Sequence, residues 1–381
     1  MNCYNNNIAS TKHGFAVRAT QGQAAPTRLT VLQAVDALDL GNQVATTSDA
    51  DERGAFIRLS LCEPEKSAWM PGYETLGLCH AAHLDTTAKP CDLEREVLLT
   101  LLACPQPFEF PSLDELTSAI RMRCHIVEGA RKTMLSFETA NAERPDDSWT
   151  YVRGKGFIVL PGVSLIAALE KATQPEISGT LYSFSCYRAS EYVILLAIAK
   201  ELAVSNPILF SQLQSFWESR AIMSGQFHDV FLHEQGSMEH PLPPGFYIPG
   251  DRVWFRNPDE ASSEASGFEG SWVVYLGNGL FANFWKRDRP FTMTTKCLEL
   301  YHWRNATFTD DEGELRVDEA KVDALVQATL HDPAEVARIV ALMWRYREAK
   351  GIYRDGGCVD TTRECPRWVR PGTSDLILPA Q

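Results

Sequence analysis

The order of local patterns between residues 150 and 310 restricts the fold more than any other feature of the chain. Helical patterns come first: Ser164 is a natural N-cap for a helix over residues 165–172, and a later helical stretch covers residues 207–220. Strand patterns follow, over residues 251–256, 271–276, 280–285 and 298–303. The middle two are joined by Gly277, Asn278 and Gly279, a tight hairpin signal. Helices followed by an antiparallel sheet predict an α+β fold.

Cys186 stands between those two helical patterns. It follows an exposed turn of mixed residues and precedes an apolar run of helical length that ends near Lys200. Its sulfur is therefore expected at a helix N-terminus, where the helix dipole lowers the pKa of a thiol and makes a nucleophilic thiolate available. A small buried core cysteine is the alternative interpretation of the same position.

Length, charge and cysteine usage restrict the class of protein. A chain of 381 residues predicts two domains with extensions. The formal net charge of -13 argues against a nucleic-acid partner, because such a partner needs a basic face. No stretch reaches the roughly 18 uninterrupted apolar residues of a membrane span. The ten cysteines lack repeated close pairs and predict reduced thiols. Without a conventional signal peptide, the protein is expected to be cytoplasmic or exported by another route.

Composition divides the chain into five expected segments. Residues 1–50 are polar and predict a mobile leader, and residues 51–145 predict an N-terminal mixed α/β domain. A polar, turn-rich run then marks the boundary to a second domain over residues 150–310, which carries Cys186. Residues 315–350 predict C-terminal helices, and residues 351–381, rich in Gly, Pro and Thr, predict a loosely held tail.

Three separated pieces of the chain occur in the order expected of one known family. Residues 157–169 read Phe-Ile-Val-Leu-Pro-Gly-Val-Ser-Leu-Ile-Ala-Ala-Leu, a strand, a Pro-x-Val-Ser turn and a helix. Residues 182–189 contain an aromatic-x-Phe-x-Cys segment that ends at Cys186. Residues 248–259 carry a Pro-Gly-Asp strand entry, and residues 270–278 read Gly-Ser-Trp-Val-Val-Tyr-Leu-Gly-Asn. Together these pieces resemble the spore-coat type of bacterial protein-glutamine gamma-glutamyltransferase, a transglutaminase.

The resemblance implies a papain-like core, in which a nucleophile-bearing helix packs on an antiparallel sheet within residues 150–310. It also implies that Cys186 attacks the carboxamide of a protein glutamine, that ammonia leaves, and that a lysine or another primary amine takes the acyl group from the thioester. The expected partners are therefore proteins that supply glutamine and lysine side chains. No cofactor and no metal are expected.

The chain departs from the family at the residues that would assist the nucleophile. Ser185 and Ser271 stand where the spore-coat type has glutamates. Glu269 lies two residues before Ser271, on the same side of a regular strand, and is a candidate replacement. Asn283 or Phe284 falls at the place of the family's histidine. Asparagine can donate a hydrogen bond but cannot accept a proton at neutral pH.

Two replacements for the missing histidine stay open. His302 lies on the next expected strand and could approach the sulfur, although a half-buried strand histidine is the plainer interpretation. Alternatively His228, His233 or His240 could reach the site from the polar loop over residues 226–240.

The candidate catalytic residues are therefore Cys186, His302, Glu269 and Asn283, in a transglutaminase-like acyltransferase. A catalytically degenerate module that only binds or supports a structure is one alternative. The other is a cysteine deamidase or peptidase that is delivered into another cell as an effector.

Overall fold

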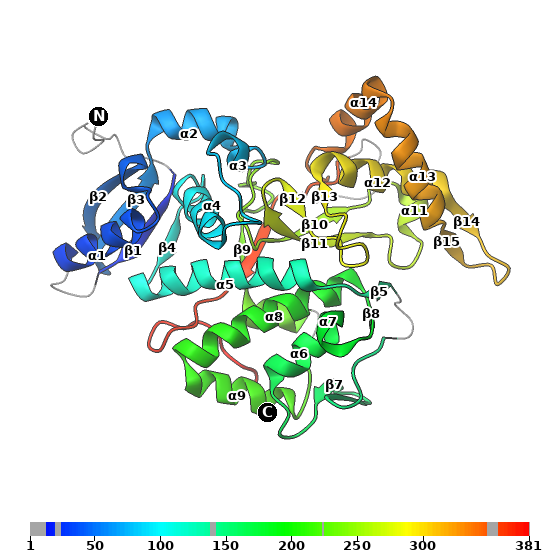
Figure 1. Ribbon diagram of the computed structural model, residues 1–381, viewed down its shortest axis with the longest axis horizontal. Helices are drawn as coiled ribbons and strands as arrows, with labels where there is room; N and C mark the ends of the chain where they lie inside the picture. The colour runs from blue at the N-terminus through cyan, green and yellow to red at the C-terminus, as the bar shows by residue number, and fades with distance from the viewer. Residues whose placement is uncertain (1–12, 20–23, 138–141, 223–224, 349–356, 381) are drawn as a thin grey trace.

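The computed structural model of the chain describes residues 13–19, 24–137, 142–222, 225–348 and 357–380 (Figure 1). Helices and antiparallel sheets are combined in it, so the predicted α+β class is confirmed. A four-stranded sheet has the order β2-β3-β1-β4, and a six-stranded sheet has the order β13-β12-β11-β10-β16-β9. No helix of the described ranges is long and apolar enough to cross a membrane. The nine cysteines in these ranges are all free thiols.

The four-stranded sheet includes residues that were expected to form a mobile leader. It consists of β1 (Phe15–Arg18), β2 (Val44–Asp51), β3 (Gly54–Leu61) and β4 (Phe108–Phe110), with α1 (Ala24–Asp36) beside it. β1 pairs with β3 and with β4, and its Phe15 and Val17 are fully buried. Residues 13–18 and 24–50 are therefore part of a folded unit. In β1 the alternating side chains of Phe15 and Val17 point to the same face of the sheet and anchor the strand, although the surrounding sequence is polar. Residues 1–12 lie outside the described residues.

Cys186 begins α8 (Cys186–Ser205), a helix in which 13 of the 20 residues are buried. A helix that is apolar on nearly every side must lie between other layers. Its neighbours are α5 (Leu113–Lys132), α6 (Leu165–Thr173), α9 (Pro207–Trp217) and the strand β11 (Gly270–Gly277). α5 comes from the segment that was assigned to a separate N-terminal domain, yet one hydrophobic core includes residues of both α5 and α8. The core therefore continues across the boundary that was expected near residues 142–148.

The six-stranded sheet lies against the nucleophile-bearing helix, as predicted. β10 (Arg252–Arg256) pairs antiparallel with β11, and β12 (Leu280–Phe281) and β13 (Phe291–Thr292) continue the sheet. The predicted hairpin joins β11 to β12. Its Gly277, Asn278 and Gly279 have φ values of 80°, 52° and 70°, a left-handed conformation that favours glycine and asparagine.

The described part of the expected tail, residues 357–380, is not loosely held. β16 (Arg363–Pro366) lies inside the six-stranded sheet, between β10 and β9 (Leu232–Gln235). The residues after it are tied to α5, since the carboxylate of Glu115 accepts hydrogen bonds from the backbone N–H groups of Val369 and Arg370 and from the hydroxyl of Thr373. The composition is that of a loop, but the backbone donors and acceptors of this segment are used by partners far away in the sequence.

The expected strand over residues 298–303 is wrong, because these residues belong to helix α12 (Met293–Ala306). Thr292 and Thr295 form a capping box that starts this helix. The expected C-terminal helices are present as α13 (Glu319–Leu330) and α14 (Pro333–Met343), which pack on α12 (Figure 1). A hairpin of β14 (Thr307–Thr309) and β15 (Leu315–Val317) connects α12 to α13.

Shorter elements complete the description. They are α2 (Glu63–Trp69), α3 (Leu78–Ala81), α4 (Pro90–Leu102), α7 (Pro175–Ser178), α10 (Gly225–Phe231) and α11 (Glu260–Ser263), the 3-10 turns η2 (Gly41–Gln43) and η3 (Pro71–Tyr73), and the strand pairs β5 (Ser136–Phe137) with β8 (Ser183–Phe184) and β6 (Trp149–Val152) with β7 (Gly156–Val159).

Candidate active site

Cys186 is the first residue of α8, as the sequence predicted. Ser185 is the N-cap, and its hydroxyl accepts a hydrogen bond from the backbone N–H of Arg188 at 3.3 Å. The cap satisfies one of the N–H groups that a helix leaves without an intrahelical partner, and it fixes the first turn. A serine in the place of the family's glutamate therefore still serves the start of the helix.

The surroundings of the sulfur act on its ionisation in opposite directions. Burial raises the pKa of the Cys186 thiol above its ordinary value. Hydrogen bonding to the backbones of Trp272 and Tyr187 and the positive charges of Lys296 and Arg252 favour the thiolate and limit that increase. The net direction is opposite to the one predicted from the helix N-terminus alone. The thiol therefore needs a group that accepts its proton before it can attack a substrate.

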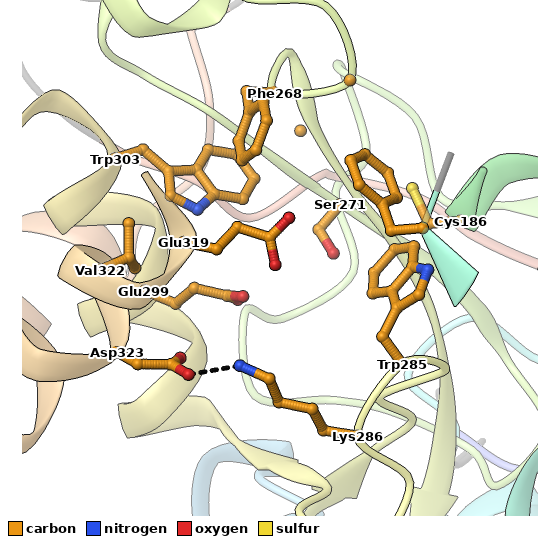
Figure 2. Close-up of a pocket in the computed structure, with 13 residues that line it drawn as sticks. Cys186, Phe268, Ser271, Trp285, Lys286, Glu299, Trp303, Glu319, Val322 and Asp323 are labelled. Carbon is orange, nitrogen blue, oxygen red and sulfur yellow. Dashed lines mark hydrogen bonds and ion pairs between the residues drawn. The ribbon is translucent and has the colours of Figure 1, made fainter. Parts of the chain in front are cut away.

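A pocket of about 520 Å³, its open mouth included, lies at Cys186 (Figure 2). Four aromatic side chains, Phe137, Phe268, Trp285 and Trp303, contribute to its wall. The rings of Phe137 and Trp285 contact each other with centroids 4.9 Å apart, and those of Phe268 and Trp303 are 5.0 Å apart. The largely apolar wall with a few polar groups is typical of sites that bind small molecules or single side chains.

The polar part of the pocket is built around Lys296. This side chain is buried, and its Nζ donates a hydrogen bond to the Oγ of Ser271 at 3.1 Å. The same Nζ forms an ion pair with Glu299 at 2.5 Å and lies 3.5 Å from the centroid of the Phe291 ring. Ser271 and Glu299 line the pocket together with Cys186. The strand β11 and the helix α12 thus place a hydroxyl and a carboxylate in the lining of the pocket that holds the thiol, with the ammonium behind them.

The mouth of the pocket is acidic. Glu319 and Asp323, both from α13, line it, and Asp323 forms an ion pair with Lys286. In Figure 2 the carboxylates of Glu299 and Glu319 point from the α12 and α13 side toward the wall that carries Ser271 and Cys186. Within the described ranges, no group of three His, Cys, Asp or Glu side chains is arranged to hold a metal ion.

The structure does not bring the other three predicted site residues into this pocket. Glu269 is exposed and precedes the first residue of β11, so the alternation of a regular strand does not apply to it. Asn283 is buried and organises the loop after β12: its Oδ1 accepts hydrogen bonds from the backbone N–H groups of Trp285 and Lys286, and its Nδ2 donates to the carbonyl of Arg289. Asn283 therefore supports two pocket residues from behind.

His302 lies on the helix α12, where a strand was expected, and is not among the residues that line the pocket. Its Nε2 is hydrogen-bonded to the hydroxyl of Thr329 on α13 at 2.8 Å, and its Nδ1 to the side chain of Asn305 at 3.1 Å. Burial lowers the pKa of His302. These contacts join two helices.

The histidines that were expected on a polar loop are also used elsewhere. Much of that segment is regular structure, since His228 lies on α10 and His233 on β9. His228 is bonded to Glu364 at 2.8 Å, and His233 is bonded to Asp375 at 2.5 Å, so each connects its element to the C-terminal segment. His240 does not line the pocket either. No described histidine lines the pocket of Cys186.

Sequence reasoning missed the pair of Lys296 and Glu299. The alternating residues 298–303 suggested a strand, and a strand has no i, i+3 neighbours on one face. The Thr292 and Thr295 capping box was the available signal, because it predicts a helix on which Lys296 and Glu299 are one turn apart.

Comparisons with known proteins agree with the three matching pieces of sequence. A family model described as protein-glutamine gamma-glutamyltransferase matches residues 78–356. A protein-glutamine gamma-glutamyltransferase of Halalkalibacterium halodurans is 26% identical over 204 residues, which cover 52% of this chain and 66% of that protein. The corresponding Bacillus licheniformis protein is 24% identical over 196 residues, 50% of this chain and 72% of that protein. The chain thus spans just under two thirds of the first relative.

A solved structure is also similar to part of the chain. It is a transglutaminase from Geobacillus stearothermophilus without its C-terminal extension, 20% identical, which covers 57% of this chain and 98% of that one with a TM-score of 0.39. The family match begins at residue 78, upstream of the segment 150–310 that was expected to hold the catalytic domain.

Proposed function

Because the chain belongs to the protein-glutamine gamma-glutamyltransferase family, we propose that it transfers the acyl group of a protein glutamine to a primary amine through a thioester at Cys186. The position of Cys186 carries this proposal. It starts a buried helix, it lines an aromatic-walled pocket, and it lies inside the segment that the family model matches.

The reaction needs two substitutions at one carbonyl carbon. The sulfur of Cys186 forms a bond to the carboxamide carbon of glutamine, and the C–N bond breaks to release ammonia. A lysine amine then attacks the thioester carbon, the C–S bond breaks, and an isopeptide bond results. Backbone N–H groups beside the sulfur, such as that of Trp272, are of the kind that stabilises the intermediate oxyanion.

The pocket suits the side chains that would enter it. The aromatic walls can cover the methylene groups of glutamine and lysine, and desolvated aromatic faces also attract an ammonium group. The carboxylates of Glu319 and Asp323 at the mouth favour a cationic acceptor over an anionic one.

Mass spectrometry of a glutamine-containing protein incubated with the purified chain and a primary amine tests the proposal. The expected result is an amine adduct on glutamine with the wild type and none with Cys186→Ala. If wild type and variant give neither an adduct nor deamidation, the acyltransferase proposal is wrong.

One observation favours a second candidate function, a cysteine deamidase or an inactive binding module. The pocket lining of the described residues contains no histidine that could activate the acceptor amine. Conversion of glutamine to glutamate without amine incorporation would identify a deamidase. An intact substrate together with a Cys186 that iodoacetamide does not alkylate would identify a binding module.

A further inference from the structure

The strongest unexplained feature near Cys186 is a buried cation. Lys296 is 1% exposed, although an isolated ammonium in a protein interior costs several kcal/mol. It is retained by three contacts: the hydroxyl of Ser271, the carboxylate of Glu299 and the face of the Phe291 ring. An ordinary i, i+3 helix pair lies at the surface and needs no such enclosure.

The contacts of Lys296 lead directly to the reactive pocket. Ser271 and Glu299 are both pocket residues, and Lys296 holds the two from behind. Its charge acts on the Cys186 sulfur in the direction that favours the thiolate. The pocket lining therefore carries a thiol and a carboxylate that can accept a proton, and an ammonium that can offset negative charge lies directly behind that lining.

We propose that the Lys296 and Glu299 pair performs the work for which the pocket has no histidine: Glu299 accepts and returns the proton, and Lys296 stabilises the negative charge that develops on sulfur and substrate. This inference rests on the proposed acyl transfer and names the groups that support it. Glu299 is the proton-transfer residue, and Lys296 acts on the sulfur by its charge while its contacts hold Ser271 and Glu299 in position.

Each proton that Glu299 accepts during one catalytic cycle is also returned. Glu299 takes the proton from the Cys186 thiol as the C–S bond forms, and it gives that proton to the departing amine as the C–N bond breaks, so ammonia leaves uncharged. The acceptor amine attacks the thioester and transfers one proton to Glu299. That proton returns to the sulfur when the C–S bond breaks.

Other titratable and charged groups lie around the thiol and the pocket. Arg252 from β10 acts on the sulfur by its charge, and it is paired with Glu364 from β16 and lies over the phenol ring of Tyr187 on α8. The pocket lining itself carries Lys286 from the loop after β12 and Glu319 and Asp323 from α13. Lys286 differs from the buried Lys296 because Lys286 is partly exposed and is paired with Asp323 at the mouth.

The rate of Cys186 alkylation by iodoacetamide, measured against pH in the full-length protein, tests the charge assignment. Lys296→Met is expected to raise the apparent pKa of alkylation by about one pH unit, since it removes an opposite charge near the thiolate. Glu299→Gln is expected to lower it, because it removes a like charge and leaves the ammonium. Lys200→Met, at the far end of α8 and paired with Glu170, is the matched control and should leave the profile unchanged.

Acyl transfer gives the second readout. Glu299→Gln is expected to lose about 100-fold in amine incorporation, the usual range for one general acid–base group, even though its thiol ionises more readily. A merely structural ion pair would instead shift the alkylation profile in the same direction when either partner is removed. Such parallel shifts, or a Glu299→Gln variant that transfers at the wild-type rate, would overturn the inference.

One further variant keeps the test decisive. If Lys296→Met does not fold, Lys296→Arg retains the charge and should keep the wild-type alkylation profile, while Glu299→Gln still separates the two interpretations. If the wild type transfers no acyl group, the proposed function fails. The opposite alkylation shifts would then still support the charge assignment, and parallel shifts would reject it.

Discussion

Replacement of Arg252 by Met should be one of the most destabilising single changes near the site. The guanidinium is 1% exposed and donates to the Oγ of Ser190 at 2.8 Å and to the carboxylate of Glu364 at 2.7 Å. It also lies 3.9 Å from the Trp272 ring centroid and 4.5 Å from that of Tyr187, the residue after Cys186. Breaking a buried ion pair by removing one partner costs about 3–5 kcal/mol.

The protonation state of His228, a second cation at Glu364, determines how much Arg252→Met costs within this range of about 3–5 kcal/mol. Glu364 is also bonded to His228, and this hydrogen bond raises the pKa of His228 above 6.5. The stability from a protonated His228 is therefore fully present below pH 6.5 and is lost as the pH rises through its folded pKa. At pH 6 the imidazolium still compensates Glu364, and we expect Arg252→Met to cost about 3 kcal/mol. Once the pH has risen through its folded pKa, the imidazole is neutral, and the cost should increase by about 1 kcal/mol, the difference between a charged and a neutral hydrogen bond.

Urea unfolding followed by tryptophan fluorescence at pH 6 and over a series of higher pH values measures both costs. Glu364→Gln combined with Arg252→Met should recover part of the loss, because an amide does not need the missing cation. Lys200→Met, which breaks a partly exposed pair, is the control and should cost below about 1 kcal/mol. A loss under about 1 kcal/mol for Arg252→Met, or a loss that stays constant over the whole pH series, would refute the reasoning.

Three further predictions concern the helix start, the C-terminal segment and the misplaced histidine. Ser185→Ala should lower the unfolding free energy by about 1 kcal/mol in thermal or urea melts, and an unchanged melt would show that the cap contributes nothing. Burial alone would lower the pKa of His233, but its interactions with Asp375 and Cys365 raise it to about 9. The stability that the protonated His233 and Asp375 pair contributes is therefore fully present below pH 6.5 and is lost as the pH rises through about 9. Asp375→Asn should flatten the decline of the unfolding free energy between these two pH values. A decline as steep as that of the wild type would contradict this prediction. His302→Gln should keep amine incorporation within about twofold of the wild type while lowering the melting temperature, and a large loss of activity in a stable variant would return His302 to the site.

Local signals were sufficient for the part of the site that carries the nucleophile. The start of α8 follows from an N-cap serine and an apolar run, and the hairpin after β11 follows from two glycines around Asn278. Both depend on residues within a few positions of one another. The sequence therefore placed Cys186 at the start of a helix and the hairpin at the end of β11.

The rest of the site depends on contacts that no local pattern contains. Leu298, Leu300 and His302 alternate like a strand, but the capping box before them and the burial of Lys296 on a helix face decide for α12. The direction of the Cys186 pKa was predicted from the helix dipole alone, whereas burial by distant segments outweighs it. β16 is four residues long and has no pattern of its own, since its pairing is supplied by β9 and β10.

The interior place of β16 also sets an order for folding. Arg252 and Glu364 are 112 positions apart in the sequence, so the strand that balances the charge beside Cys186 can dock only after a long loop has closed. Contacts between residues so far apart in the sequence form slowly, because the entropy cost of closing the long loop precedes the stabilising contacts. The helices around α8 can assemble earlier from nearer contacts. Cys186 should therefore acquire its final reactivity late in refolding, after most helical signal has returned, and pulse alkylation during refolding would measure that delay.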